Sequence, residues 1–244
     1  MKFIQIRHAS CIIELDNIRF LIDPIFYKKN TLSPVEGGIN KNNPLIDITI
    51  EMKLLENIDS IILTHLHRDH FDPEIIKIFG KDIPVICQSE YENKLSELGF
   101  INLHLVNRKI QYNDIEIECI KGEHGIGEVG ISMGNTYGFI LKKQNNEVIY
   151  LTGDTIWCKN VEEAIEKYKP KIIIGFAGSA MVKNVHITLD ENDIKTILDK
   201  NQNIKLIVNH MDAWNHCFLT KEKLTTLIQN KNLYIPNDGE VIDI

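Results

Sequence analysis

The densest set of metal-binding side chains in this chain is the heptapeptide THLHRDH at residues 64–70. It places three imidazoles and one carboxylate directly after the apolar run 61–63, which predicts a buried strand that ends at the cluster. Imidazole nitrogen suits zinc, iron and other borderline divalent metals, and carboxylate oxygen binds nearly all of them. The pattern therefore predicts a metal site at the C-terminal end of this strand.

Three further ligand-type side chains, His124, Asp154 and His210, each follow an apolar run with the character of a strand. Taken alone, each is equally well explained as a polar loop residue. Because metal-binding and catalytic groups tend to collect at strand ends on one edge of a layered fold, their repeated placement predicts that they join the 64–70 cluster.

The elements that must position these groups are short strands alternating with helices. Strand-like runs occur at the start of the chain (3–6, 11–13 and 18–22, the last two joined by a turn at Asp16-Asn17) and in the middle. Helices are predicted at 72–79, 89–98, 161–168, 189–198 and 221–228, with Asp72 and Pro73 as cap and first residue of the first. This order predicts an α/β sandwich of two packed sheets with helices outside.

Residues 28–48 are rich in Asn, Lys, Pro and Gly and predict a surface loop, which is long enough to act as a flap over a site. Disorder is the alternative for this segment. A glycine-rich stretch at 125–130 superficially matches a dinucleotide-binding pattern, but no helix pattern follows it, so we discount that function.

Composition narrows the class of protein. The 244 residues, with 43% hydrophobic and 25% charged, suit one soluble domain spanning 1–244. The formal net charge of -7 gives no basic bias towards nucleic acid, although a metal site would still supply local positive charge for a small anion. Five widely spaced cysteines, without a CxxC pair, favour a reducing, cytoplasmic compartment, and neither a signal peptide nor a membrane span is indicated.

The ligand-type residues, in their order along the chain, resemble the metallo-β-lactamase superfamily: the HxHxDH motif at 65–70, then His124, Asp154 and His210. The segments 21–24 (LIDP) and 8–10 (HAS) resemble the branch that includes ascorbate-6-phosphate lactonase, and 153–158 and 209–217 resemble a bacterial group within that branch. The resemblance extends over nearly the whole chain. It implies a four-layer αββα sandwich.

The resemblance also implies two divalent metal ions, with zinc favoured and manganese or iron as alternatives. One ion would be held by His65, His67 and His124, the other by Asp69, His70 and His210, with Asp154 bridging both. Two cations about 3.5–4 Å apart can share a water and lower its pKa, so that a hydroxide would attack a carbonyl or phosphoryl centre. Asp69 could also orient this nucleophile or pass a proton to the leaving group.

Other side chains are candidates for supporting roles. Asp23, at a strand end, is interpreted as the acceptor for the free ring N–H of a ligand imidazole, with a simple Asp-Pro turn as the alternative. His216, six residues beyond His210, is a candidate catalytic residue that contacts substrate. His8 and His186 are weaker candidates for the same edge, and His104 is expected to face solvent.

These patterns favour a metal-dependent hydrolase that cleaves a lactone or a phosphoester of a small, anionic metabolite. The alternatives are an RNA-directed phosphodiesterase and a metal-binding regulatory protein without turnover. A true β-lactamase is disfavoured, because Asp154 stands where those enzymes often carry Cys or Ser. We expect a small-molecule substrate, no nucleic-acid or membrane partner, and a chain that can form a homo-oligomer.

Overall fold

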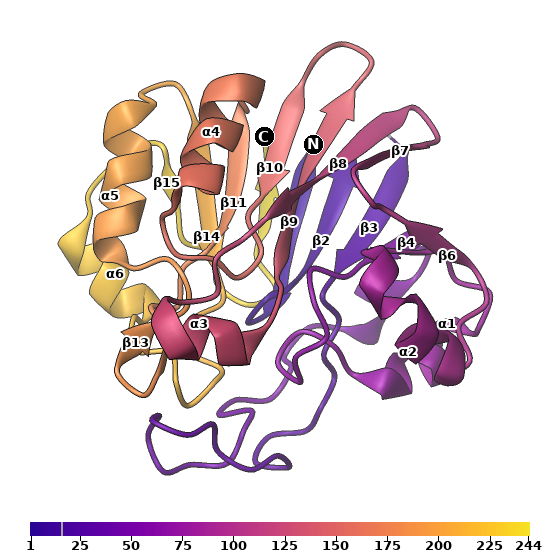
Figure 1. The fold of residues 1–244 in the computed structure, drawn as a ribbon, viewed down its shortest axis with the longest axis horizontal. Coiled ribbons are helices and arrows are strands. Elements are labelled where there is room, and N and C mark those ends of the chain that lie inside the picture. The colour runs from indigo at the N-terminus through magenta and orange to yellow at the C-terminus, as the bar shows by residue number, and fades with distance from the viewer. Residues whose placement is uncertain (16) are drawn as a thin grey trace.

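The computed structural model describes residues 1–15 and 17–244, and it folds them into two stacked sheets with helices on both outer faces (Figure 1). The predicted turn at Asp16-Asn17 includes a residue outside this described part, but the strands on either side of it pair antiparallel as predicted. None of the helices among the described residues is long and apolar enough to cross a membrane.

The first sheet has seven strands. In spatial order they are β16 (Val241–Asp243), β1 (Lys2–Arg7), β2 (Ser10–Leu15), β3 (Ile18–Ile22), β4 (Ser60–Ile62), β5 (Val85–Cys87) and β6 (Leu103–Leu105). Strands β3 to β6 are parallel, and β1 points the same way as β3 because both are antiparallel to β2. The C-terminal ends of β1, β3 and β4 therefore lie at one edge of the sheet.

The second sheet also has seven strands. Their spatial order is β15 (Leu233–Tyr234), β14 (Lys205–Asn209), β11 (Ile172–Phe176), β10 (Val148–Leu151), β9 (Tyr137–Lys143), β8 (Ile115–Lys121) and β7 (Lys109–Tyr112). Strands β10, β11, β14 and β15 are parallel, and β8 shares their direction because both β8 and β10 are antiparallel to β9. The ends of β8, β10 and β14 thus meet at one edge too.

Helices cover both outer faces and complete four layers. The helices are α1 (Ile76–Phe79), α2 (Glu92–Glu97), α3 (Gly127–Met133), α4 (Lys159–Tyr168), α5 (Glu191–Lys200) and α6 (Lys221–Leu227), with 3₁₀ turns at Met52–Leu55, Pro73–Ile75 and Ser89–Tyr91. Helices α4, α5 and α6 pack on the second sheet, and α2 with the turn before α1 packs on the first. The predicted four-layer αββα sandwich is confirmed.

Apolar side chains on both faces of each sheet explain this layering. Phe3 and Ile62 of the first sheet pack with Phe139 and Ile174 of the second in one central core. On the outer side, Ile61 contributes to a separate core beneath the helices. Strands buried on both faces read as continuous apolar runs, which is why the 61–63 segment was recognisable from sequence.

Helix α3, a small hairpin and the 3₁₀ turn at Met52–Leu55 were not predicted. Helix α3 begins at Gly127, within the glycine-rich stretch where no helix was predicted. It leads into β9, which is antiparallel to β8, so the parallel strand–helix–strand unit of a dinucleotide site is not formed there. A small hairpin of β12 (Met181–Val182) and β13 (Val185–His186) was also not predicted, because two-residue strands are too short to show periodicity.

The loop at 28–48, hereafter the strap, crosses the lower part of the molecule in Figure 1 and is held by Asn215. The Asn215 side chain donates to the carbonyl oxygens of Val35 and Ile39 and accepts from the Val35 N–H and from Asn43 Nδ2. Gly38 lies so close that a Cβ there would meet the Asn215 backbone oxygen at 2.5 Å. The strap is therefore an ordered loop rather than a disordered one.

Candidate active site

The strand ends described above bring all seven sequence-predicted ligands into one cluster. The residues with donor atoms in mutual reach form three overlapping groups: His65, His67 and His124; Asp69, His70, His210 and also His8; and His65, His70 and Asp154. Within each group all donor atoms lie within 4.8 Å of one another. This division reproduces the two ligand sets implied by the family resemblance, with one additional histidine.

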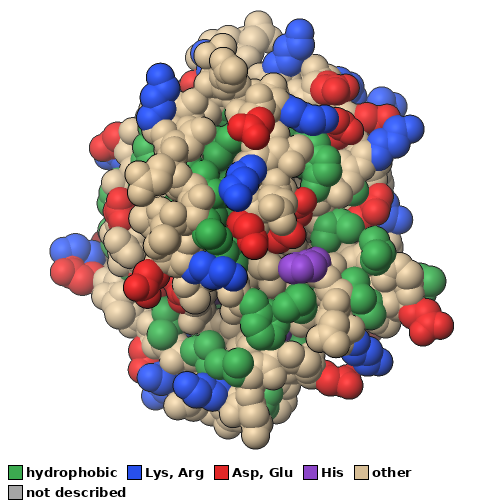
Figure 2. All heavy atoms as spheres, turned by 90° about the vertical axis from the view of Figure 1, so that its left-hand side faces the viewer, with side chains coloured by type: hydrophobic (Ala, Val, Ile, Leu, Met, Phe, Trp, Pro, Cys, Tyr) green, Lys and Arg blue, Asp and Glu red, His purple; other side chains and the backbone are tan. Residues whose placement is uncertain are grey.

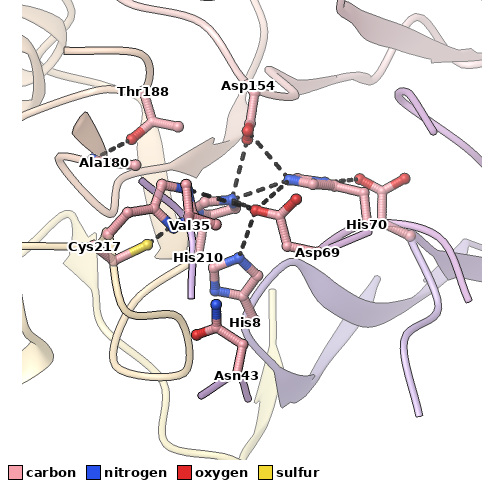
Figure 3. A network of polar contacts seen from close by, with 12 residues as sticks. His8, Val35, Asn43, Asp69, His70, Asp154, Ala180, Thr188, His210 and Cys217 are labelled. Carbon is pink, nitrogen blue, oxygen red and sulfur yellow. Dashed lines mark hydrogen bonds and ion pairs between the residues drawn. The ribbon is translucent and has the colours of Figure 1, made fainter. Parts of the chain in front are cut away.

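Asp154 faces His70 and His210 of the second set (Figure 3), and it also lies close to His124 of the first set. Its Oδ2 is 3.7 Å from His124 Nε2 and 3.1 Å from His70 Nε2, while its Oδ1 is 3.3 Å from His210 Nε2. Gly153 precedes it with a φ of 62°, and a Cβ there would meet the Tyr137 oxygen at 2.4 Å, so the turn that delivers Asp154 requires glycine. Asp154 is thus placed where a carboxylate can face two cations.

Hydrogen bonds fix which ring nitrogen of two histidines faces the cluster. His124 Nδ1 lies 2.8 Å from the carbonyl oxygen of Ile187, which can only accept, so the proton is on Nδ1 and the lone pair is on Nε2. His70 Nδ1 lies 2.8 Å from Asp23 Oδ2. This contact is the one predicted for Asp23, and it directs His70 Nε2 into the site.

Thr64 extends the same arrangement to His65. Its hydroxyl donates to Asp23 Oδ2 at 2.6 Å, so Thr64 Oγ1 is left to accept a hydrogen bond from His65 Nδ1, which is 3.0 Å away. His65 Nε2 then carries a lone pair that points towards Asp154. One buried carboxylate, Asp23, therefore orients two ligand imidazoles, the first directly and the second through Thr64.

The pKa values of these groups reflect burial and their neighbours. Burial lowers the pKa of His65 and of His210 well below the ordinary value, which keeps both imidazoles neutral and able to donate a lone pair. Burial alone would raise the pKa of Asp154, but the neighbouring His210 and His70 hold it well below its usual range. Conversely, burial lowers the pKa of His70, but Asp154 and Asp69 raise it well above the ordinary value.

A divalent cation fits this donor set. Within the described residues, the buried His65 Nε2 and Asp154 Oδ1 have no hydrogen-bond partner, although buried polar atoms are normally paired. Both atoms point into the cluster of imidazoles and carboxylates, which are the ligands preferred by zinc, manganese and iron. Unpaired, convergent donors of these types are what a metal site requires.

The cluster opens into a cleft of about 260 Å³ beneath the strap. Its lining consists of Pro34, Val35, Glu36, His67, Arg68, Asp69, His124, Met133 and His216. The Arg68 guanidinium is engaged by the strap, because it donates to the Ser33 hydroxyl and to the carbonyl oxygens of Ser33 and Pro34. The strap therefore forms one wall of the entrance.

The other histidines occupy different positions relative to the cleft and the ligand groups. His216 lines the cleft, with Nε2 3.7 Å from Asp69 Oδ2, and burial lowers its pKa to about 4. His186 lies on β13 and is exposed, outside the residues that line this cleft. His104, expected to face solvent, is half-buried and packs edge-on against Tyr112. His8, which sequence reasoning gave a minor place, lies directly in the second ligand group.

The fold and this cluster define a known class of protein. The sequence profile of the Beta-lactamase superfamily domain matches residues 18–211, so the chain belongs to that family. The chain is also 31% identical over 250 residues to UPF0173 protein YddR of Bacillus subtilis, and the alignment covers 98% of each chain.

Solved structures agree with this assignment. A possible metal-dependent hydrolase from Veillonella parvula superposes with a TM-score of 0.96 at 27% identity, covering 100% of this chain and 99% of the other. An isothiocyanate hydrolase from Delia radicum gut bacteria superposes with a TM-score of 0.92 at 26% identity, with the same coverage. The predicted metallo-β-lactamase fold is therefore confirmed, whereas the narrower lactonase branch stays a prediction.

Proposed function

We propose that this protein is a metal-dependent hydrolase that holds two divalent ions and cleaves a lactone or phosphoester of a small metabolite. The observation that carries the proposal is Asp154, whose oxygens lie 3.1–3.9 Å from imidazole nitrogens of both ligand groups. Similarity to a possible metal-dependent hydrolase over the whole chain supports it. Zinc remains the favoured metal, because five of the seven proposed ligands are imidazoles.

When bound, a pair of divalent ions would supply a water of lowered pKa and would stabilise negative charge on the substrate oxygen. The chain's own residues then have distinct tasks. Asp69 lies within 4 Å of His8, His70, His210 and His216, so it can orient the attacking nucleophile at the centre of the site. His216, neutral and facing the cleft, can donate a hydrogen bond to a substrate oxygen.

The cleft limits the size of the substrate. Its volume of about 260 Å³ is below the ~300–1,000 Å³ of sites that enclose drug-sized ligands. Pro34, Val35 and Met133 give it apolar walls, and Arg68, the cationic side chain among the described residues that line it, is already hydrogen-bonded to the strap. Any anionic group of the substrate would therefore depend on the metal ions for recognition.

An isothiocyanate is a second candidate substrate. The related isothiocyanate hydrolase has nearly the same backbone, and the apolar walls of this cleft suit a neutral molecule with a hydrocarbon tail. The central carbon of an isothiocyanate is electrophilic, as a lactone carbonyl carbon is. The same site could therefore serve both substrates.

RNA is a poorer fit than either small molecule. The net charge is -7, and Lys and Arg are interspersed with Asp and Glu on the face shown in Figure 2. RNA-binding surfaces usually gather positive charge along the path of the backbone. RNA is therefore included only as one of the substrates in the test that follows.

The test is hydrolysis by protein loaded with Zn²⁺ or Mn²⁺, assayed against lactones, phosphomonoesters, phosphodiesters, isothiocyanates and a short RNA. We expect turnover of a lactone, phosphoester or isothiocyanate that falls by about 100-fold or more in Asp154→Asn and is kept in His104→Ala, which changes a histidine outside the cluster. Turnover of RNA alone would replace the proposal with the phosphodiesterase function. A fully metal-loaded protein without turnover of any class would support the regulatory alternative.

A further inference from the structure

His8 occupies a strained position in the turn between β1 and β2. Its φ is 55°, in the left-handed region that a turn would normally fill with Gly or Asn. The backbone is held there because the His8 carbonyl oxygen accepts from the His210 N–H at 3.0 Å and from Gln5 Nε2 at 2.8 Å. Strain of this kind persists where the surrounding structure enforces it, and it tends to mark functional positions.

The ring of His8 is fixed and fully enclosed. It is only 1% exposed and lies between the ring of His210, at 3.7 Å between centroids, and the indole of Trp214, at 5.0 Å. Both ring nitrogens are buried, and neither has a hydrogen-bond partner in the part of the chain that the structure describes. A buried imidazole with two unpaired nitrogens costs free energy unless another group binds it.

The position of His8 Nε2 indicates what that group is. It lies 3.6 Å from Asp69 Oδ2, too far for a hydrogen bond, and the Nε2 atoms of His70 and His210 lie 3.8 and 3.9 Å from the same oxygen (Figure 3). Neighbouring ligands about 2.0–2.2 Å from a five-coordinate zinc are separated by roughly 3.0–3.6 Å, close to the shortest of these values. His8 therefore has the spacing of a co-ligand of Asp69, His70 and His210.

His216 provides the contrast. Its Nε2 is also close to Asp69 Oδ2, at 3.7 Å, but it belongs to none of the groups whose donor atoms are in mutual reach among the described residues. It lines the cleft, which His8 does not. Two buried histidines at the same distance from one carboxylate thus point to different roles.

We propose that His8 Nε2 is a direct ligand of the second metal ion, together with Asp69, His70 and His210. The inference rests on the proposed metal centre and adds to it a residue from the β1–β2 turn. Because His8 comes from the first hairpin of the chain, the second ion would bind that hairpin to the end of β14 on the opposite sheet.

The first test is Zn²⁺ titration of wild type, His8→Asn and His216→Ala. Asparagine tolerates the left-handed backbone that alanine would strain, so His8→Asn removes the imidazole with least damage to the turn. We expect His8→Asn to bind the second Zn²⁺ at least tenfold more weakly and the first as wild type does, whereas His216→Ala binds both normally. Equal affinity of His8→Asn and wild type for both ions would overturn the proposal.

The second test separates a ligand from a positioning residue, since either could weaken binding. In Zn²⁺-loaded protein with ¹⁵N-labelled histidine, the Nε2 resonance that is missing in His8→Asn should lie among those of zinc-bound nitrogens. A resonance of a free imidazole would overturn the proposal. Equally weaker binding of both Zn²⁺ ions by His8→Asn would overturn it too. If wild type itself binds fewer than two Zn²⁺, the result contradicts the proposed two-ion centre and not only the role of His8.

Discussion

At the scale of single residues, Asp154 is the side chain whose charge matters most, because its oxygens lie close to imidazoles of both ligand groups. Asp154→Asn keeps the shape but has one oxygen and no charge, so we expect turnover to fall by about 100-fold or more while circular dichroism stays native-like. Asp190→Asn is the matched control, because asparagine caps α5 as well as aspartate does. Near-normal turnover of Asp154→Asn would mean that Asp154 does not bridge two ions.

His216 gives a different prediction, since it faces the cleft and not the ligand groups. We expect His216→Ala to keep its metal content and to lower kcat/KM by roughly tenfold or more, the loss of a hydrogen bond to the substrate. Metal analysis and steady-state kinetics measure the two effects, with the exposed His186→Ala as control. Loss of a metal ion in His216→Ala would make that residue a ligand instead.

The buried imidazole of His216 also predicts a pH dependence of stability. Burial lowers its pKa to about 4, so between pH 6.5 and 4 the unfolded chain binds a proton there that the folded chain does not. Its contribution to stability is therefore lost as pH falls. We expect chelated wild type to lose about 2 kcal/mol more than His216→Ala between pH 7 and 5, measured by urea unfolding. An equal loss in both proteins would show that His216 is not buried in its neutral form.

Single residues of the site could be predicted from the sequence where the residue type alone indicates the chemistry. Three histidines and an aspartate within 64–70 predict a metal site whatever the fold, and Asp23 was assigned its hydrogen bond to an imidazole correctly. His8 was placed on the right edge but not in the group with Asp69, His70 and His210. Its position depends on a left-handed turn and on packing against Trp214, which no spacing along the chain reveals.

At the scale of elements, the strap is positioned largely by one side chain. Asn215 is 1% exposed and its amide bonds to Val35, Ile39 and Asn43 of the strap. Asn215→Ala would leave several hydrogen-bonding groups of the strap unpaired, among them the buried Asn43 amide, so we expect a loss of about 2–4 kcal/mol in the free energy of unfolding and a higher KM.

The control is Asn42→Ala, an exposed strap residue with a single side-chain hydrogen bond to Asn30. Urea unfolding and kinetics on both variants measure the effect. An unchanged KM in a destabilised Asn215→Ala would show that the strap supports the fold without shaping the cleft.

Helices and strands were predicted correctly where a periodic pattern or an apolar run extended over several residues. The helices α4 and α5 and the buried strands lie where they were expected. Helix α3 was missed because it contains Gly127 and Gly130, which lower helix propensity. Gly130 is required by packing, since a Cβ there would meet the Gly125 oxygen at 2.4 Å. The close approach of the turn at Gly125 to the helix therefore requires a glycine that lowers the helix propensity of the segment.

At the scale of the whole molecule, the cluster joins the two sheets. His65, His67, Asp69 and His70 follow β4 of the first sheet, whereas His124, Asp154 and His210 follow strands of the second. Each proposed ion has ligands from both sides. Metal ions bound there would hold together the two halves of the sandwich at the edge where the central core ends.

The last prediction follows from this placement: purified protein should contain close to two divalent ions per chain, and their removal should destabilise the whole fold. A ligand at about 1,000 times its Kd stabilises the folded state by about 4 kcal/mol, which for a chain of this size raises Tm by roughly 10 °C. Elemental analysis gives the stoichiometry, and thermal unfolding before and after EDTA treatment gives the shift, with Zn²⁺ restoring it. Asp154→Asn should show a much smaller shift, because it has lost the carboxylate that both ions share. A stoichiometry that never exceeds one after metal supplementation, or a Tm that does not respond to EDTA, would contradict the two-ion site that joins the sheets.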